Sequence, residues 1–329
     1  MLPTHTLAAY ITEGGPPECI QVGELPLPPL GASGVLVETE ALVVDPVDTY
    51  VRAGASRARL PFPYIIGRDL VGSVIAAGAS VAGAFAVGNR VWCNSMGTAG
   101  LQGSFARHVV VPAERLYHLP EGVSAVEAVA VLHGGATAYL GLIGRGSLRL
   151  GNTIVVGGAG GSVGSCVTQF AVAAGARVLA TAREDDFEWC RSIGASAVFD
   201  YRDPDLGARL REAAPEGVEM YWDTSGHHDL ELATTLLARR GTIVLMANGQ
   251  ARPVLPVGPL YARDASVLGF VLGSANTLEL AAAAHLINQQ LAAGALRVRV
   301  GVTLPLTDAA ESHRLVENGF RPGRVVLTP

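Results

Sequence analysis

Strand-like and helix-like runs alternate through the middle of this chain, and this alternation constrains its fold more than any other feature. The strand-like runs are short and mostly apolar, and they cover residues 153–156, 177–181, 198–199, 219–222 and 242–245. Helix-like runs separate them, at residues 163–174, 187–193, 206–213 and 230–239. This order is typical of βαβ units, whose parallel strands form a sheet that helices cover on both faces. The sequence therefore predicts an α/β fold with a doubly wound, Rossmann-type parallel sheet.

A glycine-rich turn joins the first of these strands to the first helix. Three glycines there are spaced three residues apart, at Gly158, Gly161 and Gly164. In such a turn the first glycine permits a tight bend, the second lets the backbone approach a pyrophosphate, and the third lets helix and strand pack closely. The phosphates would bind at the positive end of the helix, near Ser162 and Val163. The pattern predicts a dinucleotide site.

The end of the next strand bears on which dinucleotide binds. An NAD site commonly has an acidic residue there, which accepts hydrogen bonds from the ribose 2′-hydroxyl. This chain has Arg183 instead, and a guanidinium suits the 2′-phosphate of NADPH. The alternative is that Arg183 is a solvated loop charge, whose field Glu184, Asp185 and Asp186 weaken. We expect NADPH as the cofactor.

The two ends of the chain have a different pattern from the middle. The first 120 residues contain short β-type runs punctuated by Gly and Pro, which is typical of a mainly antiparallel β module. After residue 272, one helix at 277–293 and a strand at 324–327 are too few to fold alone. We therefore expect residues 1–124 and 272–329 to form one discontinuous domain, with a Rossmann domain at residues 125–271.

Composition narrows the class of protein. The net charge is −5 and no basic stripe is present to neutralise phosphates, which argues against nucleic-acid binding. The four cysteines are scattered without a CxxC pair, so neither a disulfide framework nor a zinc ribbon is indicated. The first ten residues do not resemble a signal peptide, and no apolar run is long enough to span a bilayer. We expect a cytoplasmic protein that acts on a small molecule and binds neither nucleic acid nor membranes.

Seven sequence blocks, taken in order, resemble the zeta-crystallin-like quinone oxidoreductases, which are zinc-independent members of the medium-chain dehydrogenase/reductase superfamily. The blocks are residues 35–54, 67–72, 103–119, 134–140, 158–164, 194–201 and 323–327. The resemblance implies a GroES-like, mainly antiparallel β catalytic domain beside the Rossmann domain. It also implies hydride transfer from NADPH to quinones or α,β-unsaturated carbonyl compounds (enones), and usually a homodimer. Two copies should then pair through the strand-like run at residues 265–272.

The resemblance also implies roles for single residues. Tyr50 matches a tyrosine of the substrate pocket, and Thr137 matches a threonine that contacts the nicotinamide. Tyr201 matches a tyrosine near the adenosine phosphate. Further cofactor contacts are implied at Asn248, Phe270, Val271, Leu272 and Arg324. The last of these stands where a lysine is common.

The zinc alcohol dehydrogenases share this fold, and their metal positions can be traced in the chain by motif. Their structural zinc needs four cysteines in one loop, and the corresponding loop here contains only Cys93. Their catalytic ligands correspond to Asp45, Arg68 and His133, with Asp69 directly after Arg68. A guanidinium is always charged and cannot bind a metal. We therefore expect no bound metal, although carboxylate and imidazole ligands remain.

Asp45, Arg68 and His133 are expected to converge where zinc would bind and, with Tyr50, to act as catalytic residues. Quinone reductases usually have an Asn and an apolar residue in place of Asp45 and His133. An Asp and a His beside a nicotinamide can deliver the proton that hydride addition to a quinone or enone requires. The alternative is structural, with Asp45 paired to Arg68 and His133 bonded to backbone. The other histidines show no paired spacing, and we expect them at the surface or in loops: His5, His108, His118, His227, His228, His285 and His313.

The function indicated is NADPH-dependent reduction of quinones or enones. Two alternatives remain open at this point. One is an alcohol dehydrogenase-like enzyme with a degenerate metal site, and the other is a non-catalytic nucleotide-binding protein of the same fold, since a fold alone does not prove catalysis.

Overall fold

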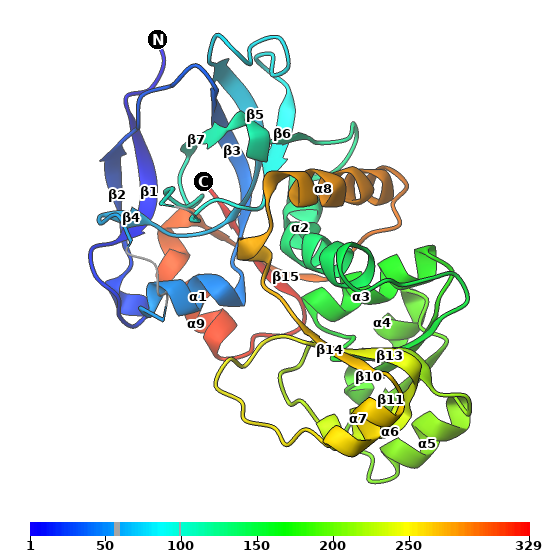
Figure 1. The fold of residues 1–329 in the computed structure, drawn as a ribbon. Coiled ribbons are helices and arrows are strands. Elements are labelled where there is room, and N and C mark those ends of the chain that lie inside the picture. The colour runs from blue at the N-terminus through cyan, green and yellow to red at the C-terminus, as the bar shows by residue number, and fades with distance from the viewer. Residues whose placement is uncertain (56–59, 99) are drawn as a thin grey trace. The chain divides into compact units, whose positions relative to one another are not determined.

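The computed structural model describes residues 1–55, 60–98 and 100–329, which form two compact units (Figure 1). The first unit contains Met1–His133 and Leu280–Pro329, and the second contains Gly134–Glu279. The chain therefore leaves the first unit once and returns to it. The unit boundaries fall within helices α2 (Ala125–Tyr139) and α8 (Thr277–Ala292), whereas the sequence placed the domain boundaries at 124/125 and 271/272.

The first unit consists mainly of antiparallel β-strands. They are β1 (His5–Ile11), β2 (Gln21–Pro26), β3 (Gly34–Val43), β4 (Tyr64–Ile65), β5 (Asp69–Ala77), β6 (Arg90–Cys93), β7 (His108–Pro112), β8 (Tyr117–His118), β15 (Val300–Pro305) and β16 (Arg324–Thr328). One sheet has the order β2-β1-β4, and the other has the order β15-β16-β3-β5-β6-β8, with β7 also paired to β3. Strand β16 pairs antiparallel with β3, so the C-terminal segment completes the sheet that the N-terminal segment begins.

Apolar side chains from both sheets form the core of the first unit. Ile11, Leu42, Leu70, Phe105 and Leu327 are among its buried members. Helices α1 (Pro46–Arg52) and α9 (Ala309–Glu317) contact each other beside this core. Because α1 follows β3 almost directly, the residues between them are held at the C-terminal end of a central strand of the sheet.

The second unit is a parallel sheet with helices on both faces (Figure 1). Its strands are β9 (Thr153–Gly157), β10 (Arg177–Ala182), β11 (Ala197–Asp200), β12 (Val218–Asp223), β13 (Leu237–Leu245) and β14 (Ser266–Gly269). Its helices are α3 (Ser162–Ala173), α4 (Phe187–Ser192), α5 (Leu206–Ala213), α6 (Leu230–Leu236) and α7 (Val257–Ala262). The strand order β11-β10-β9-β12-β13-β14 is the doubly wound order of a Rossmann sheet.

Strand periodicity explains how the two faces of this sheet are covered. Val155, Leu179 and Tyr221 point to one face, where they pack with buried residues of α5 and α6. Their neighbours along the strands, such as Ile154 and Val156, are equally buried but face the other side, on which α3 lies. The sequence of a strand that is buried on both faces is a nearly continuous apolar run. The strands of this unit have that pattern.

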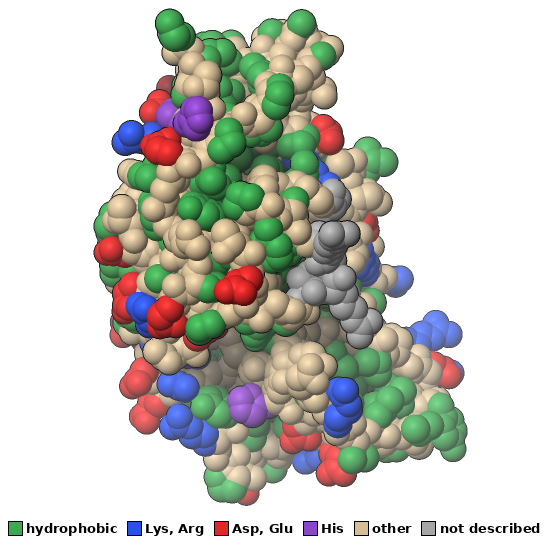
Figure 2. Space-filling view, turned by 90° about the vertical axis from the view of Figure 1, so that its left-hand side faces the viewer, with side chains coloured by type: hydrophobic (Ala, Val, Ile, Leu, Met, Phe, Trp, Pro, Cys, Tyr) green, Lys and Arg blue, Asp and Glu red, His purple; other side chains and the backbone are tan. Residues whose placement is uncertain are grey.

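The distribution of charge on the surface and the burial of helix α2 both indicate which class of protein this is. On the face drawn in Figure 2, hydrophobic side chains lie among small groups of acidic and basic ones, which are interspersed. The helical stretch Ala125–Gly144 is long and apolar enough to cross a membrane, but 72% of it is buried inside the protein. Such burial is typical of a core helix.

Candidate active site and cofactor site

The glycine-rich turn lies between β9 and α3 in the second unit. Gly158 has a φ of +71°, a left-handed conformation that residues with side chains rarely adopt. A Cβ on Gly164 would lie 2.3 Å from the carbonyl oxygen of Gly158, so turn and helix are too close for a side chain there. Gly161 is the N-cap of α3, and Ser162 and Val163 form its first turn, where backbone N–H groups have no intrahelical acceptor. These groups and the helix dipole together fit the phosphates of a dinucleotide.

Basic side chains gather where β10 and β11 end. Arg183 follows β10 and is exposed, and Tyr201 and Arg202 follow the neighbouring strand β11. The hydroxyl of Tyr201 accepts a hydrogen bond from Arg202 Nε at 3.3 Å, and interactions with Arg202 and Arg183 lower the pKa of this tyrosine. The Arg202 guanidinium also lies over the Tyr201 ring, 5.3 Å from its centre. Two guanidinium groups near one phenol form a site suited to a phosphate.

A pocket of about 380 Å³ opens beyond the carboxyl ends of β12 and β13. It is lined by Ser225, Gly226, His227, Asn248, Ala251, Arg252 and Pro253. Asn248, one of the expected cofactor residues, donates from its amide to the Gly226 carbonyl at 3.2 Å. The carboxyl ends of strands are where doubly wound sheets bind their ligands.

An Asp–His pair, which the sequence did not indicate, organises the loop beside this pocket. Asp223 ends β12, and its carboxylate accepts hydrogen bonds from the backbone N–H of Ser225 at 2.7 Å and of His228 at 2.8 Å. His228 Nδ1 also lies 2.9 Å from the same carboxylate. The expectation of surface or loop positions was wrong for His313, which is buried in α9, whereas His228 lies in a loop as expected although its side chain is buried. An acidic residue at the carboxyl end of a parallel strand was the signal that could have revealed Asp223.

The remaining expected cofactor residues of the second unit have different environments. Thr137 is buried on α2. Phe270 packs edge-to-face against Trp222, with ring centres 6.0 Å apart. Val271 is exposed and Leu272 is buried. Phe270 and Leu272 therefore have a packing role, whatever else they contact.

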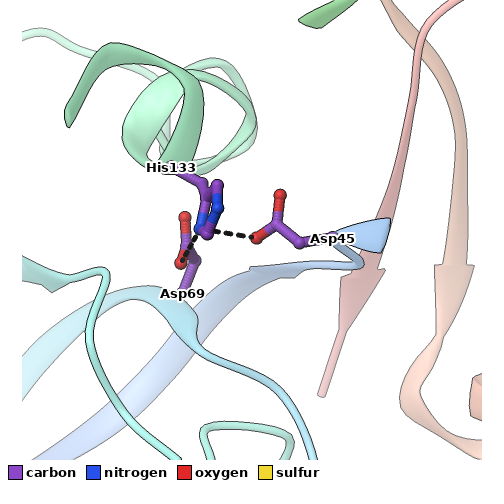
Figure 3. A group of neighbouring side chains, drawn as sticks. All are labelled: Asp45, Asp69 and His133. Carbon is purple, nitrogen blue, oxygen red and sulfur yellow. Dashed lines mark ion pairs between the residues drawn. The ribbon is translucent and has the colours of Figure 1, made fainter. Parts of the chain in front are cut away.

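In the first unit, the carboxyl groups of two aspartates from different elements meet at the imidazole of His133 (Figure 3). Asp45 is the N-cap of α1, Asp69 is the first residue of β5, and His133 lies on α2. His133 Nδ1 is 3.6 Å from Asp45 Oδ2 and 3.9 Å from Asp69 Oδ1. The local fold of α1 explains the place of Asp45, because Pro46 starts the helix and Asp48 accepts from the Asp45 backbone N–H at 2.9 Å. The structure thus brings Asp45 and His133 together, and it adds Asp69.

Two guanidinium groups complete this cluster. Arg324 of β16 donates from Nη2 to Asp45 Oδ1, and both side chains are buried. Arg68 Nε lies 3.7 Å from Asp48 Oδ1. The alternative in which Asp45 pairs with Arg68 is therefore not what forms. Arg324, which the resemblance assigned to the cofactor, takes the place of Arg68 as the partner of Asp45. We refer to Asp45, Asp48, Arg68, Asp69, His133 and Arg324 as the charge cluster.

Burial and mutual charge set the protonation of the cluster. Burial raises the pKa of Asp69 well above its usual range, and the carboxylates of Asp45 and Asp48 add to this. Burial, reinforced by Asp45, also raises the pKa of Asp48 to about 7. Burial opposes the ionisation of Asp45, but attraction to His133 and Arg324 lowers its pKa. Burial lowers the pKa of His133, and the carboxylate of Asp45 opposes this shift. Arg324, which is always charged, also favours the ionised form of Asp45.

The fourth expected catalytic residue, Tyr50, differs from the carboxylates of the charge cluster because its side chain is exposed to solvent. It stands on the same short helix as Asp48 but is 56% exposed. Its side chain is thus free to meet a substrate, whereas the buried carboxylates of the cluster are not.

Comparison with known proteins gives the family. Two family models match, the alcohol dehydrogenase GroES-like domain over residues 31–121 and the zinc-binding dehydrogenase over residues 162–289. The quinone oxidoreductase of Homo sapiens is 27% identical, over 97% of each chain. The chain belongs to the medium-chain dehydrogenase/reductase superfamily. Within this superfamily it resembles the quinone oxidoreductases, as the sequence blocks predicted.

Solved structures of this superfamily confirm the predicted fold class. An alcohol dehydrogenase superfamily protein from Novosphingobium aromaticivorans has a TM-score of 0.89 and 28% identity, covering 98% of this chain and 99% of that one. The quinone oxidoreductase of Escherichia coli, solved in complex with NADPH, has a TM-score of 0.84 and 25% identity, covering 98% and 99%. The chain is an oxidoreductase of this superfamily, with a Rossmann-type unit and a GroES-like unit.

Proposed function

We propose that this chain is a zinc-independent, NADPH-dependent oxidoreductase that transfers hydride to quinones or enones. The observation that carries the proposal is the charge cluster. At the positions where zinc dehydrogenases hold their metal, this chain supplies its own cations, Arg68 and Arg324, and a set of carboxyl groups around His133. Such a site has no Lewis acid to polarise an alcohol, but it can supply a proton to a reduced acceptor.

The preference for NADPH over NADH is supported by the basic site at the ends of β10 and β11. Arg202 donates to the Tyr201 hydroxyl, and Arg183 lies near enough to the same hydroxyl to lower its pKa, so both cations stand where the two strands end. Asp186 is turned inward, where a Cβ on Gly160 would meet its carboxylate. The Asp186 carboxylate therefore lies against the glycine-rich turn, and its negative charge there counts against a 2′-phosphate. When bound, the cofactor supplies the hydride.

Zinc independence is supported by the charges around His133. Three carboxyl groups against two guanidinium groups leave one negative charge when His133 is neutral. A single proton brings this buried cluster to neutrality, whereas a divalent cation would leave it with a positive charge and no partner. In addition, Arg324 already occupies one oxygen of Asp45. These charges support the proposal that the cluster acts without zinc.

His133 is the group that we assign to proton delivery. Its Nδ1 is buried, but 19% of its side chain is exposed, while the carboxylates beside it are buried. His133 also precedes Thr137 by four residues on α2, which places both on one face of that helix. Tyr50 remains the expected pocket residue, and Asp45 holds the imidazole in place.

A homodimer, a small-molecule substrate and a cytoplasmic location belong to the same proposal. The dimer is supported by β14, which is the last strand of its sheet. Val267 of β14 and the neighbouring Tyr261 and Val271 are exposed apolar residues, and an exposed apolar edge strand is usually paired or covered.

A second function, an alcohol dehydrogenase with a degenerate metal site, is favoured by one observation. The potential ligand atoms of Asp45, Asp69 and His133 all lie within 4.8 Å of one another. Elemental analysis separates the two, because our proposal predicts far less than one zinc per chain. A non-catalytic nucleotide-binding protein would bind NADPH without turnover on any acceptor.

The proposed function is tested by steady-state oxidation of NADPH with a panel of quinones and enones, before and after treatment with a chelator. We expect turnover that the chelator leaves unchanged, and no oxidation of alcohols by NADP⁺. Activity only with alcohols, or loss of activity on chelation, would contradict the proposal.

A further inference from the structure

Trp189, Ser165 and Ala159 form a chain of hydrogen bonds in the second unit. The indole Nε1 of Trp189, on α4, donates to Ser165 Oγ at 2.8 Å. Ser165, on α3, donates in turn from Oγ to the carbonyl oxygen of Ala159 at 3.0 Å. Ala159 belongs to the glycine-rich turn, between Gly158 and Gly160. The chain of hydrogen bonds thus joins two helices to the turn at which the phosphates of a dinucleotide are expected.

The direction of both hydrogen bonds follows from the chemistry of the groups. An indole N–H can only donate, and a carbonyl oxygen can only accept. The hydroxyl of Ser165 lies between them, so it accepts from Trp189 and donates to Ala159. Removing the indole N–H leaves the second hydrogen bond possible, whereas removing the hydroxyl breaks both.

The hydroxyl of Ser165 bonds outside its own helix. Ser165 is 1% exposed, and its backbone N–H donates to the carbonyl oxygen of Gly161 at 2.9 Å. A serine inside a helix usually bonds its hydroxyl to a carbonyl of the preceding turn of the same helix. The acceptor here is Ala159, six residues earlier and before α3 begins. The hydroxyl therefore fixes the turn and not the helix.

Both backbone groups of Ala159 are anchored. Its N–H donates to the carbonyl oxygen of Thr181, on β10, at 3.1 Å, and its own carbonyl accepts from Ser165. The C=O and N–H of a planar trans peptide group point in opposite directions, so an anchored carbonyl also fixes the direction of the next N–H. The turn therefore enters α3 in one defined orientation, and this sets where the N–H groups of Ser162 and Val163 point.

Helix α4 contacts the glycine-rich turn at a second place. Asp186 is the N-cap of α4, and a Cβ on Gly160 would meet its carboxylate. Asp186 and Trp189 are three residues apart, so they lie on one face of this helical segment. The segment follows directly on Arg183, which we assign to the 2′-phosphate. A shift of the turn relative to α4 would thus change the distance between the two expected phosphate positions.

We propose that Ser165 and Trp189 are positioning residues for the cofactor, whose hydrogen bonds hold the glycine-rich turn in the shape that receives the pyrophosphate. The inference rests on the proposed function, which supplies the dinucleotide. It deepens that function by naming two residues that act on the cofactor through the turn. Because NADPH and NADH have the same pyrophosphate, the loss of either residue weakens the binding of both cofactors by the same factor.

The inference is tested by titration calorimetry, which measures the Kd of NADPH and of NADH for the parent and its variants. Ser165→Ala breaks both hydrogen bonds, and we expect it to raise both Kd values by about 10-fold. Trp189→Phe keeps an aromatic ring but lacks the N–H, and it should raise both values by about 3-fold. The double variant should bind no more weakly than Ser165→Ala, because both substitutions break the same chain of hydrogen bonds.

Matched controls in the first unit separate positioning from a general loss of stability. Ser312→Ala removes a buried hydroxyl that donates to Ala309 at 2.7 Å, and Trp92→Phe removes an indole N–H that donates to Asn288 at 2.9 Å. Both controls should lower the melting temperature, as the test variants do, and leave both Kd values unchanged. In Ser165→Ala the KM for NADPH should rise while kcat stays unchanged, which is the result for a contribution to binding alone.

Unchanged Kd values in Ser165→Ala and Trp189→Phe overturn the inference. A loss confined to NADPH also overturns it, because that result assigns the effect to the 2′-phosphate. If Ser165→Ala fails to fold, Trp189→Phe decides, since it leaves the Ser165 hydroxyl in place. A parent that binds neither dinucleotide overturns both the inference and the proposed function. A parent that shows the expected losses but reduces no quinone or enone contradicts the proposed function and supports the inference.

Discussion

Replacing Arg324 by Met removes the cation that holds Asp45 ionised inside the first unit. The two side chains are hydrogen-bonded and have exposures of 9% and 2%. Removing one partner of a buried ion pair costs about 3–5 kcal/mol, because the other charge is left uncompensated. His133 lies 3.6 Å from Asp45 Oδ2 and can take up part of that charge. We therefore expect Arg324→Met to lower the free energy of unfolding by about 3 kcal/mol, the lower end of this range.

Urea denaturation measures this loss. With a slope of about 2–3 kcal/mol per M, the midpoint of Arg324→Met should fall by about 1–1.5 M. Trp92 is buried in the first unit and reports its unfolding by fluorescence. The matched control is Arg314→Met, whose arginine makes exposed ion pairs on α9, and its midpoint should hardly change.

The difference in stability between the parent and Arg324→Met should become smaller as the pH falls. The pKa of Asp45 is lowered in the folded protein, so its contribution to stability is present above the unfolded pKa, about 4, and is lost as the pH falls through the lower folded pKa. Parent and Arg324→Met should therefore converge in acid. Equal midpoints at neutral pH, or a difference that persists unchanged in acid, would refute the reasoning.

Three further predictions concern the cofactor, the assembly and pH. Arg183→Ala should weaken NADPH binding by about 1.5–3 kcal/mol, or roughly 10- to 150-fold, and leave NADH binding little changed. Titration calorimetry measures both affinities, and an equal loss for the two cofactors would contradict the prediction. Light scattering should show a dimer at micromolar concentration that Val267→Asp, on edge strand β14, converts to a monomer; a monomeric parent would count against the interface. Asp48 keeps its proton to about pH 7 when folded, so its contribution to stability falls as the pH rises from about 4 to 7, and Asp48→Asn should flatten this part of the stability profile; an unchanged slope would contradict the assignment.

Local periodicity predicted most of the second unit. The strands there are buried on both faces and the helices between them are amphipathic, so most elements appear in the sequence by themselves, although the short helix α7 was not predicted. One boundary was wrong for a reason that lies outside local sequence. The helix expected over residues 230–239 ends at Leu236, because Leu237 already pairs with Val218 of β12 and starts β13. Strand pairing there overrides the helical preference of the residues that follow.

The charge cluster was only partly predictable, because its members come from distant segments. Asp45, Arg68 and His133 were found by their match to metal positions. Arg324 lies 279 residues after Asp45, and only the pairing of β16 with β3 brings it near. No spacing in the sequence indicates such a contact. The resemblance to the quinone oxidoreductases implied a cofactor contact for Arg324 instead.

Burial was the other property that the sequence did not reveal. His313 lies on α9, and both ring nitrogens are buried. Burial lowers its pKa to about 3, so it remains neutral through the physiological range. Histidine is as common at surfaces as in cores, and neither His313 nor the Asp223–His228 pair has a spacing that marks it.

The central claim is that hydride passes from NADPH to an acceptor carbon without a metal. Its most direct test uses NADPH with deuterium in place of both hydrogens at C4, an enone, and protein shown by elemental analysis to contain far less than one zinc per chain. Mass spectrometry of the product should find one deuterium bound to carbon, at the same rate with and without chelator. A product without deuterium, or turnover that appears only when zinc is added, would contradict the account.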